Sequence, residues 1–373
     1  MIFHKLFRAP LLIFSLVLIS CSAHASDVIT IGVATPQSGD FAMLGKSVLD
    51  GVSVVVDDLN AHGGLLGKQI KIVVGDDNCN PDLAVNIAKK LINDKVDAVI
   101  GHLCSGATKS ALPFYTEEKI ITISPSAANV DLTKSGSFPY FFRTIPPSNL
   151  QSKLCADFAL NILNAQKVAI IHDKSDYGNT YAGFVNRLVQ TDEYASVVLF
   201  QGFSKNNVNY NDIVQKIIKS KADTVFFGGY HPEGAKLILK LKENNIKVNF
   251  ISSVSLYTEN IFQLLGNNTD NVYLAGTKNC SPFPLNKKAT EELKKRYNKE
   301  PLGFYFEAYS AMLVLANAIE TAQSTETDKV LNALKTQKTE TPLGTIRFDK
   351  YGDLKDGGFQ MYKIKNGKFI AID

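Results

Sequence analysis

Two hydrophobic rhythms follow one another along this chain. Short, mainly apolar and β-branched runs occur at 28–34 and 70–74, and between and after them apolar residues recur three or four positions apart, at 47–60 and 82–93. Short runs predict buried strands, whereas the longer period predicts amphipathic helices. Because the two kinds of segment alternate, we expect a mostly parallel sheet with helices on both faces.

The second half of the chain repeats this alternation. Two consecutive prolines at 146–147 end the first unit, and a helix is expected from Leu150. The next elements are expected as strands at 167–172, 196–201, 224–228 and 249–252, with helices ending at 190 and covering 211–220 and 232–244. The last elements are expected as helices at 289–298 and 305–322 and strands at 344–348 and 358–364. Gly352 between the final strands predicts a hairpin.

One βαβ unit within 96–129 carries candidate chemistry. Its elements are expected at 97–100 (strand), 107–118 (helix) and 120–123 (strand). Parallel strands end at one edge of their sheet, so Ser105 and the turn 124–127 are expected to face one crevice, where open α/β sheets bind ligands. A helix N-terminus beside the Ser105 hydroxyl suits a carboxylate. The alternative is that Ser105 merely caps its helix.

Residues 1–25 have the pattern of a secretory signal. A basic start precedes the apolar run 11–19, and 23–25 read Ala-His-Ala, the small-x-small pattern of a cleavage site. The sequence therefore predicts export to the periplasm. The alternative is a lipoprotein cleavage box that leaves a lipid anchor on Cys21; we favour cleavage after residue 25 because the first strand begins so soon afterwards.

Charge and composition narrow the classes of function. The formal net charge of +4 loses two positive charges with the signal, which leaves +2. Near neutrality argues against a nucleic-acid partner. A mature chain of about 350 residues predicts two domains. The run 11–19 is too short to predict a membrane span, and no later segment qualifies.

Four of the five cysteines remain in the mature chain, in a compartment where disulfides persist. Cys79 and Cys104 each follow an expected strand of the same sheet, so we expect a disulfide between them. Cys155 and Cys280 are expected to be separate thiols. A metal site is not expected, since no cysteine has a close Cys-x-x-Cys partner.

Motifs of catalysis are incomplete. The glycines of 39–47 are separated by five residues, whereas a phosphate-binding P-loop needs four. Ser105 lacks the flanking glycines of a nucleophile elbow. The remaining candidates read better as structural residues than as metal ligands or bases, namely Asp76, Asp77, Asp82, His102, His172 and His231. The sequence predicts neither enzymatic activity nor a cofactor.

Two tyrosines have a different setting. Tyr177 and Tyr230 each follow a strand of the expected second domain, where they would face a crevice between domains. A tyrosine offers apolar area and one hydroxyl to a ligand there. Packing alone is the alternative.

These stretches carry a family resemblance that spans nearly the whole mature chain. The similar segments are Asn60–Gly64 with Gly67-Lys68, Asp76–Cys79, Val99–Ser105, His172–Lys174 with Tyr177-Gly178, Gly228–Glu233 and Gly352–Lys355. They resemble the periplasmic leucine/isoleucine/valine-binding proteins of ABC importers. The resemblance also implies the disulfide between Cys79 and Cys104.

The resemblance implies an α/β fold with two doubly wound parallel-sheet lobes joined by a three-strand hinge, the type I periplasmic binding fold. The first lobe is expected to comprise 26–146 plus 279–343, and the second 147–278 plus 344–373. A small ligand, an amino acid or carboxylate, would be trapped as the lobes close. The expected partner is an ABC permease of the inner membrane, and the expected form is a monomer. A periplasmic ligand sensor is the alternative.

The resemblance also assigns site residues. It implies that the ligand carboxylate is held by Ser105 and by the loop of Ser126, Ala127 and Ala128, while Tyr177 and Tyr230 come from the other lobe. This chain departs from the family pattern at three positions. Ala128 stands where the family has a threonine, and Leu44 stands where it has an aromatic residue. Val254 stands where the family has a glutamate that binds the α-ammonium group.

The loss at Val254 leaves two hypotheses open. A buried ammonium without a carboxylate costs several kcal/mol. Either Glu233 or Glu259 supplies the missing charge in a rearranged cleft, or the ligand is a carboxylate or amide that lacks an α-ammonium group.

Overall fold

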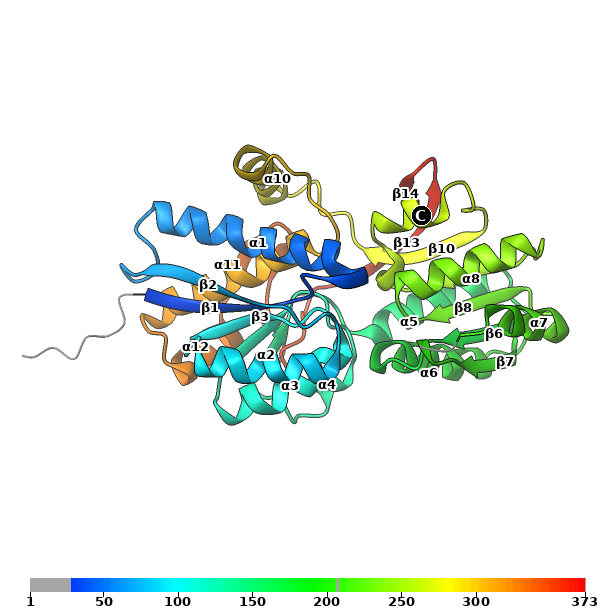
Figure 1. The fold of residues 1–373 in the computed structure, drawn as a ribbon, viewed down its shortest axis with the longest axis horizontal. Helices are drawn as coiled ribbons and strands as arrows, with labels where there is room; N and C mark the ends of the chain where they lie inside the picture. Colours follow the sequence, from blue (N-terminus) through cyan, green and yellow to red (C-terminus); the bar gives the residue numbers. More distant parts are fainter. Residues whose placement is uncertain (1–27, 206–207, 373) are drawn as a thin grey trace, which may run out of the picture.

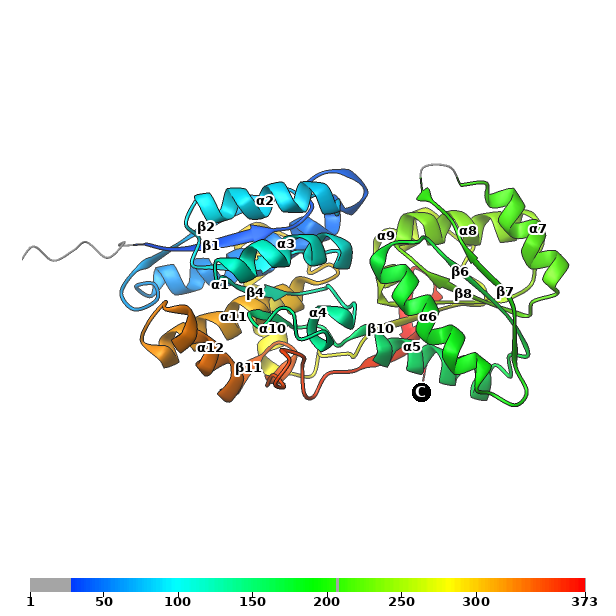
Figure 2. The same cartoon turned by 90° about the horizontal axis from the view of Figure 1, so that it is seen from below.

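The computed structural model describes residues 28–205 and 208–372, which form two α/β lobes placed end to end (Figures 1 and 2). The predicted signal segment 1–25 and the alternative anchor Cys21 lie outside the described residues. Within the described part of the chain, no helix combines the length and the apolar character that crossing a membrane requires.

The first lobe is built on a five-stranded parallel sheet. In spatial order its strands are β2 (Gln69–Gly75), β1 (Val28–Ala34), β3 (Ala98–Gly101), β4 (Ile121–Ser124) and β5 (Phe141–Arg143). Every residue of β3 and β4 is buried, because helices cover both faces of the sheet. The predicted βαβ unit is therefore the centre of this sheet.

Seven helices of the described chain surround that sheet. They are α1 (Ala42–Ala61), α2 (Pro81–Asn93), α3 (Ser105–Glu117), α4 (Asp131–Lys134), α10 (Pro284–Tyr297), α11 (Tyr305–Ala322) and α12 (Thr327–Thr336). Helix α1 packs on α11 at one face, whereas α2 packs on α3 at the other (Figure 1). Helix α1 begins five residues earlier than its apolar period predicts, so Leu44 lies in its first turn.

The second lobe contains a seven-stranded mixed sheet. In spatial order its strands are β14 (Lys368–Ala371), β13 (Phe359–Lys365), β10 (Val272–Thr277), β9 (Asn249–Ser252), β8 (Thr224–Gly228), β6 (Lys167–His172) and β7 (Ser196–Gly202). Strands β6 to β10 are parallel, and β13 and β14 join antiparallel at one edge. Its helices are α5 (Ser148–Asp157), α6 (Asp176–Gln190), α7 (Tyr210–Ser220), α8 (His231–Glu243) and α9 (Asn260–Leu265).

Three segments cross between the lobes, after β5, after β10 and before β13. The third crossing differs from the sequence prediction. The chain does reverse direction at Gly352, where Phe348 and Leu354 form an antiparallel bridge. The strand β12 (Gly344–Ile346), however, pairs with β11 (Thr339–Thr341) and not with β13. Ile346 and Phe348 pack in the core of the first lobe. Leu354 packs against the same core, so we place the last change of lobe after Leu354. A strand pattern alone does not reveal which sheet a strand joins.

Candidate functional site

A pocket lies between the two lobes, at the carboxyl ends of their parallel strands. Its described lining residues are Phe41, Leu44, Leu103, Ser105, Ser126 and Phe304 from the first lobe and Tyr177, Tyr230, Val254 and Ser255 from the second. The structure thus brings together six predicted residues that lie far apart in the sequence. Their shared pocket is apolar apart from hydroxyl groups, and none of its lining side chains is charged.

Ser105 begins the helix α3 at the edge of the pocket. Its hydroxyl oxygen accepts the backbone N–H of Asn129 at 3.2 Å. Ser105 is the first residue of α3 and not its cap. The cap is Cys104, whose side chain makes no capping hydrogen bond. The first N–H groups of a helix have no partner within it and carry partial positive charge, so this end of α3 suits an anion.

The loop after β4 reaches the pocket through one of its three predicted residues. The Ser126 hydroxyl donates to the Leu103 carbonyl at 2.7 Å, which leaves its oxygen as an acceptor. Ala127 and Ala128 are fully buried and do not line the pocket. Their carbonyls accept from the Arg143 side chain and the Ser148 N–H, respectively, and these bonds brace the loop.

Tyr230 approaches the same helix end from the opposite lobe. Burial raises the pKa of Tyr230 well above its usual value, and the Ser105 backbone N–H nearby lowers it by a smaller amount. The Tyr177 hydroxyl donates to the side chain of Gln151 at 3.1 Å. Tyr230 and Ser105 therefore line the same pocket from opposite lobes, and the phenol of Tyr230 is neutral.

The pocket is narrow in this structure. Its free volume is about 20 Å³, which is room for roughly one water molecule. Val254 is 4% exposed, and its N–H donates to Gln151. A ligand must therefore part the lobes or displace Tyr230 before it reaches Ser105.

The two carboxylates named as substitutes for the missing charge have different settings. Glu233 does not line the pocket; its carboxylate lies 3.7 Å from the Lys205 ammonium, which also lies 3.4 Å from Asp173. Lys205 stacks over the Tyr230 ring at 4.8 Å. Glu233 thus shares the single charge of Lys205 with Asp173 within its own lobe, and Glu259 lies in a different cavity.

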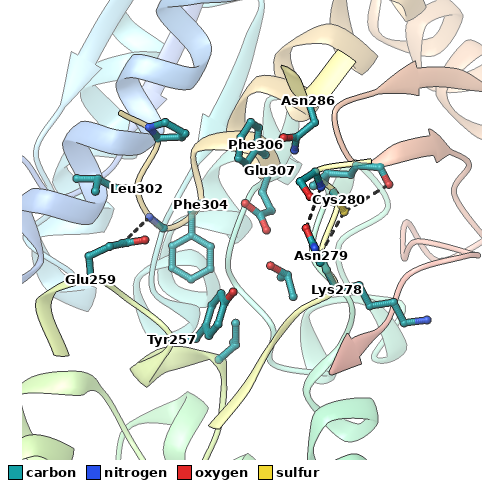
Figure 3. A pocket seen from close by; sticks show the side chains of 16 residues that line it. Tyr257, Glu259, Lys278, Asn279, Cys280, Asn286, Leu302, Phe304, Phe306 and Glu307 are labelled. Atoms are coloured by element: carbon teal, nitrogen blue, oxygen red, sulfur yellow. Dashed lines mark hydrogen bonds between the residues drawn. The ribbon is translucent and has the colours of Figure 1, made fainter. Parts of the chain in front are cut away.

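Glu259 lines a larger crevice beside the hinge, which Figure 3 shows from close by. This crevice has a free volume of about 190 Å³ and shares Val254 and Phe304 with the pocket at Ser105. Burial raises the pKa of Glu259 and raises the pKa of Glu307, on the opposite wall, to about 7.

Contacts at the rim join the lobes. The ammonium of Lys109 on α3 lies 2.8 Å from the carboxylate of Asp176 at the start of α6. The Asn129 side chain also donates to the carbonyl and the carboxylate of Asp176. These contacts place the described structure in a closed arrangement.

The cysteines near the site are paired as the sequence predicts, and a buried ion pair lies beside them. Cys79 and Cys104 form the expected disulfide, and Cys155 and Cys280 are free. Asp77 and His102 form a fully buried pair, with Oδ2 and Nδ1 2.5 Å apart. That pair belongs to the scaffold, and no metal-binding group of three or more candidate ligands occurs in the described residues.

Four lining residues were not predicted. Leu103 and Ser255 lie within two residues of predicted positions, and Phe41 precedes Leu44 by about one helical turn. These three residues could therefore have been found from their closeness in sequence to predicted site residues. Phe304 had no such signal. It lies before α11, some two hundred residues from Ser105, and reaches the pocket only because the chain has crossed the hinge twice.

Comparison with known sequences identifies relatives over most of the chain. A family model described as "Periplasmic binding protein" matches residues 28–368. The "Leucine-, isoleucine-, valine-, threonine-, and alanine-binding protein" of Pseudomonas aeruginosa is 33% identical over 340 residues, which cover 91% of this chain and 90% of that protein.

Solved structures have the same arrangement of lobes. The branched-chain amino acid transporter substrate binding protein of Streptococcus pneumoniae, in complex with isoleucine, is 26% identical, with a TM-score of 0.82, over 92% of this chain and 98% of that one. A solute binding protein of an ABC transporter from R. palustris, in complex with benzoate, also has a TM-score of 0.82, at 20% identity over 92% of this chain and 95% of that one. This second likeness shows the fold alone.

Proposed function

The chain belongs to the periplasmic binding protein family, and we propose that it captures a small apolar carboxylate between its lobes. It is a substrate-binding protein of an ABC transporter in the branched-chain amino acid group, not an enzyme. Its proposed partner is an inner-membrane permease, which would read the closed form, and its proposed working form is a periplasmic monomer.

The end of α3 carries this proposal. Ser105 uses its hydroxyl oxygen to accept from Asn129, which leaves its O–H available to donate. The helix N–H groups and this O–H converge on one position, and the other lining groups are mainly aliphatic or aromatic. Such a pocket favours one anionic head attached to an apolar body.

A branched-chain amino acid is the first candidate ligand, because relatives are named for such ligands. Its α-ammonium group would need oxygen acceptors. Ser126 and Tyr230 offer hydroxyl oxygens at the pocket, and they are neutral.

A carboxylate without an α-ammonium group is the second candidate. The observation that favours it is Val254, which puts an isopropyl group in the pocket wall where the family pattern has a glutamate. No charged side chain among the lining residues replaces that glutamate, so an α-ammonium group would be buried without a counter-charge.

A thermal-shift panel tests the proposal and separates the candidates. Leucine, isoleucine and valine are compared with their 2-oxo acids, with short carboxylates and with the corresponding amides. We expect carboxylates to raise the melting temperature and amides to raise it less, because only an anion gains from the helix end. The proposal is wrong if no carboxylate shifts the transition. Stabilisation by leucine alone would eliminate the second candidate.

Ser105→Ala is expected to weaken binding of the best carboxylate about 10- to 100-fold, the loss of one hydrogen bond to a charged group. Isothermal titration calorimetry measures it. Ser110→Ala is the matched control, since Ser110 lies on the same helix outside the pocket. Equal affinities of the two variants would show that the ligand binds elsewhere.

A further inference from the structure

The crevice beside the hinge has no role in the site described so far. Aromatic rings of Tyr257, Phe304 and Phe306 line it together with the carboxylates of Glu259 and Glu307. Its free volume of about 190 Å³ far exceeds the 20 Å³ of the pocket at Ser105. Rings and carboxylates around an open space are the surroundings that an organic ammonium group prefers.

The two carboxylates have no cation of their own. Glu307 is 5% exposed, and the nearby Thr277 hydroxyl partly offsets the effect of burial on its pKa. Glu259 accepts from the Gly303 N–H at 3.2 Å. Neither acid forms an ion pair with another described residue. Burial raises the pKa of both, and the charge of Glu259 raises that of Glu307 further.

Lys278 also lines the crevice without neutralising these acids. In Figure 3 its ammonium group extends away from Glu307 and Glu259, and no ion pair joins it to either. A metal ion fits less well than an ammonium group, because no group of three candidate ligands occurs in the described residues. The nearly buried Glu307 therefore lines the crevice without an ion pair to any side chain that the structure describes.

The crevice adjoins the pocket at Ser105. Val254 and Phe304 line both spaces, so these two side chains form the partition between them. In the view of Figure 3, the Phe304 ring stands between Glu259 and Glu307. A ligand that displaces this ring passes from the anion-binding end of α3 to the two carboxylates.

We propose that the crevice is the second half of the ligand site and binds the terminal ammonium of an extended ω-amino carboxylate. This inference rests on the proposed function, because the carboxylate of that ligand lies at Ser105. Its chain would pass Val254 and Phe304, and its ammonium would lie between Glu259 and Glu307. The counter-charge absent at Val254 is thus supplied farther along the cleft.

Matched pairs of ligands provide the test. We expect 5-aminopentanoate or 6-aminohexanoate to bind at least about 10-fold more tightly than pentanoate or hexanoate, respectively, since the charged contact adds one strong hydrogen bond. Glu307→Gln should lower the affinity for the aminated ligand about 10-fold and leave the affinity for the unaminated ligand unchanged. Glu259→Gln should act in the same direction, and Glu320→Gln, at an exposed position of the same helix, should have no effect.

The pH profile gives a second readout. Glu307 is faced by Glu259, Tyr257, Cys280 and Lys278, and its pKa is raised to about 7. The ligand ammonium stays protonated well above that pH, so binding requires Glu307 to lose its proton. Affinity for the aminated ligand should rise about 10-fold between pH 6 and pH 8, and Glu307→Gln should abolish that rise.

The outcomes separate the two proposals. If leucine or the unaminated carboxylates bind but neither ω-amino acid binds more tightly, the second compartment is wrong and the proposed function stands. Equal losses of affinity for the aminated and the unaminated ligand in Glu307→Gln would also overturn the second compartment, since the effect of the substitution would then be structural. If no carboxylate of any kind binds, both proposals fail.

Discussion

Replacing Arg143 with methionine is expected to lower the free energy of unfolding by about 3–5 kcal/mol, the usual cost of breaking a buried ion pair. Arg143 is fully buried, and its Nε donates to Asp353 at 2.7 Å. Its other nitrogens donate to the carbonyls of Ala127 and Asn129 and to the Thr133 hydroxyl. Methionine fills similar volume but leaves a buried carboxylate and two carbonyls without these donors.

The same substitution should weaken ligand binding. The loop that Arg143 holds carries Ser126, and its Asn129 N–H positions the Ser105 hydroxyl. Urea denaturation and calorimetric titration measure the two effects. Arg347→Met is the control, because Arg347 makes an exposed ion pair with Asp356, which is worth about 1 kcal/mol at most. Similar stabilities of the two variants would contradict the assigned role of Arg143.

Removing the disulfide is expected to cost roughly 3 kcal/mol of stability by the chain-entropy estimate for a loop of this length. Cys79 and Cys104 are 25 residues apart, and Cys104 immediately precedes Ser105. The double variant Cys79→Ala/Cys104→Ala should therefore unfold at lower urea concentration and bind carboxylates less tightly, because the start of α3 loses its anchor to the loop after β2.

Two measurements check this explanation. Reduction of the unmodified protein should reproduce the shift of the double variant, since both remove the same bond. Cys280→Ser, which alters a thiol outside the disulfide, should change stability by less than about 1 kcal/mol. An unchanged urea midpoint after complete reduction would show that the bond contributes nothing to stability.

The first-lobe half of the site could be predicted because its parts are close in sequence. A βαβ unit places the start of its helix and the end of its second strand at one sheet edge by geometry alone. The structure puts Ser105 and Ser126 together there. Tyr177 and Tyr230 could be singled out because each follows a strand of the second lobe, but they face that edge only after the lobes approach each other.

The hinge crevice could not be predicted in the same way. Glu307 sits in a strongly apolar helix, and its importance depends on the cavity in front of it, which Glu259 enters from the other lobe. Likewise, the apolar residues of β12 predict a buried strand but do not say which core buries it. Both features depend on which lobe each segment joins after the chain crosses the hinge. The hydrophobic period of a segment carries no information about the lobe that it joins.

The rim contact of Lys109 with Asp176 makes the resting state of the molecule sensitive to dissolved salt. Both side chains are partly exposed, so mobile ions at about 0.15 M screen their attraction over a distance of about 8 Å. At low ionic strength this ion pair favours the closed form even without a ligand, and at high ionic strength it favours that form less. Ionic strength therefore shifts the balance between open and closed empty protein, by no more than the roughly 1 kcal/mol that an exposed ion pair contributes.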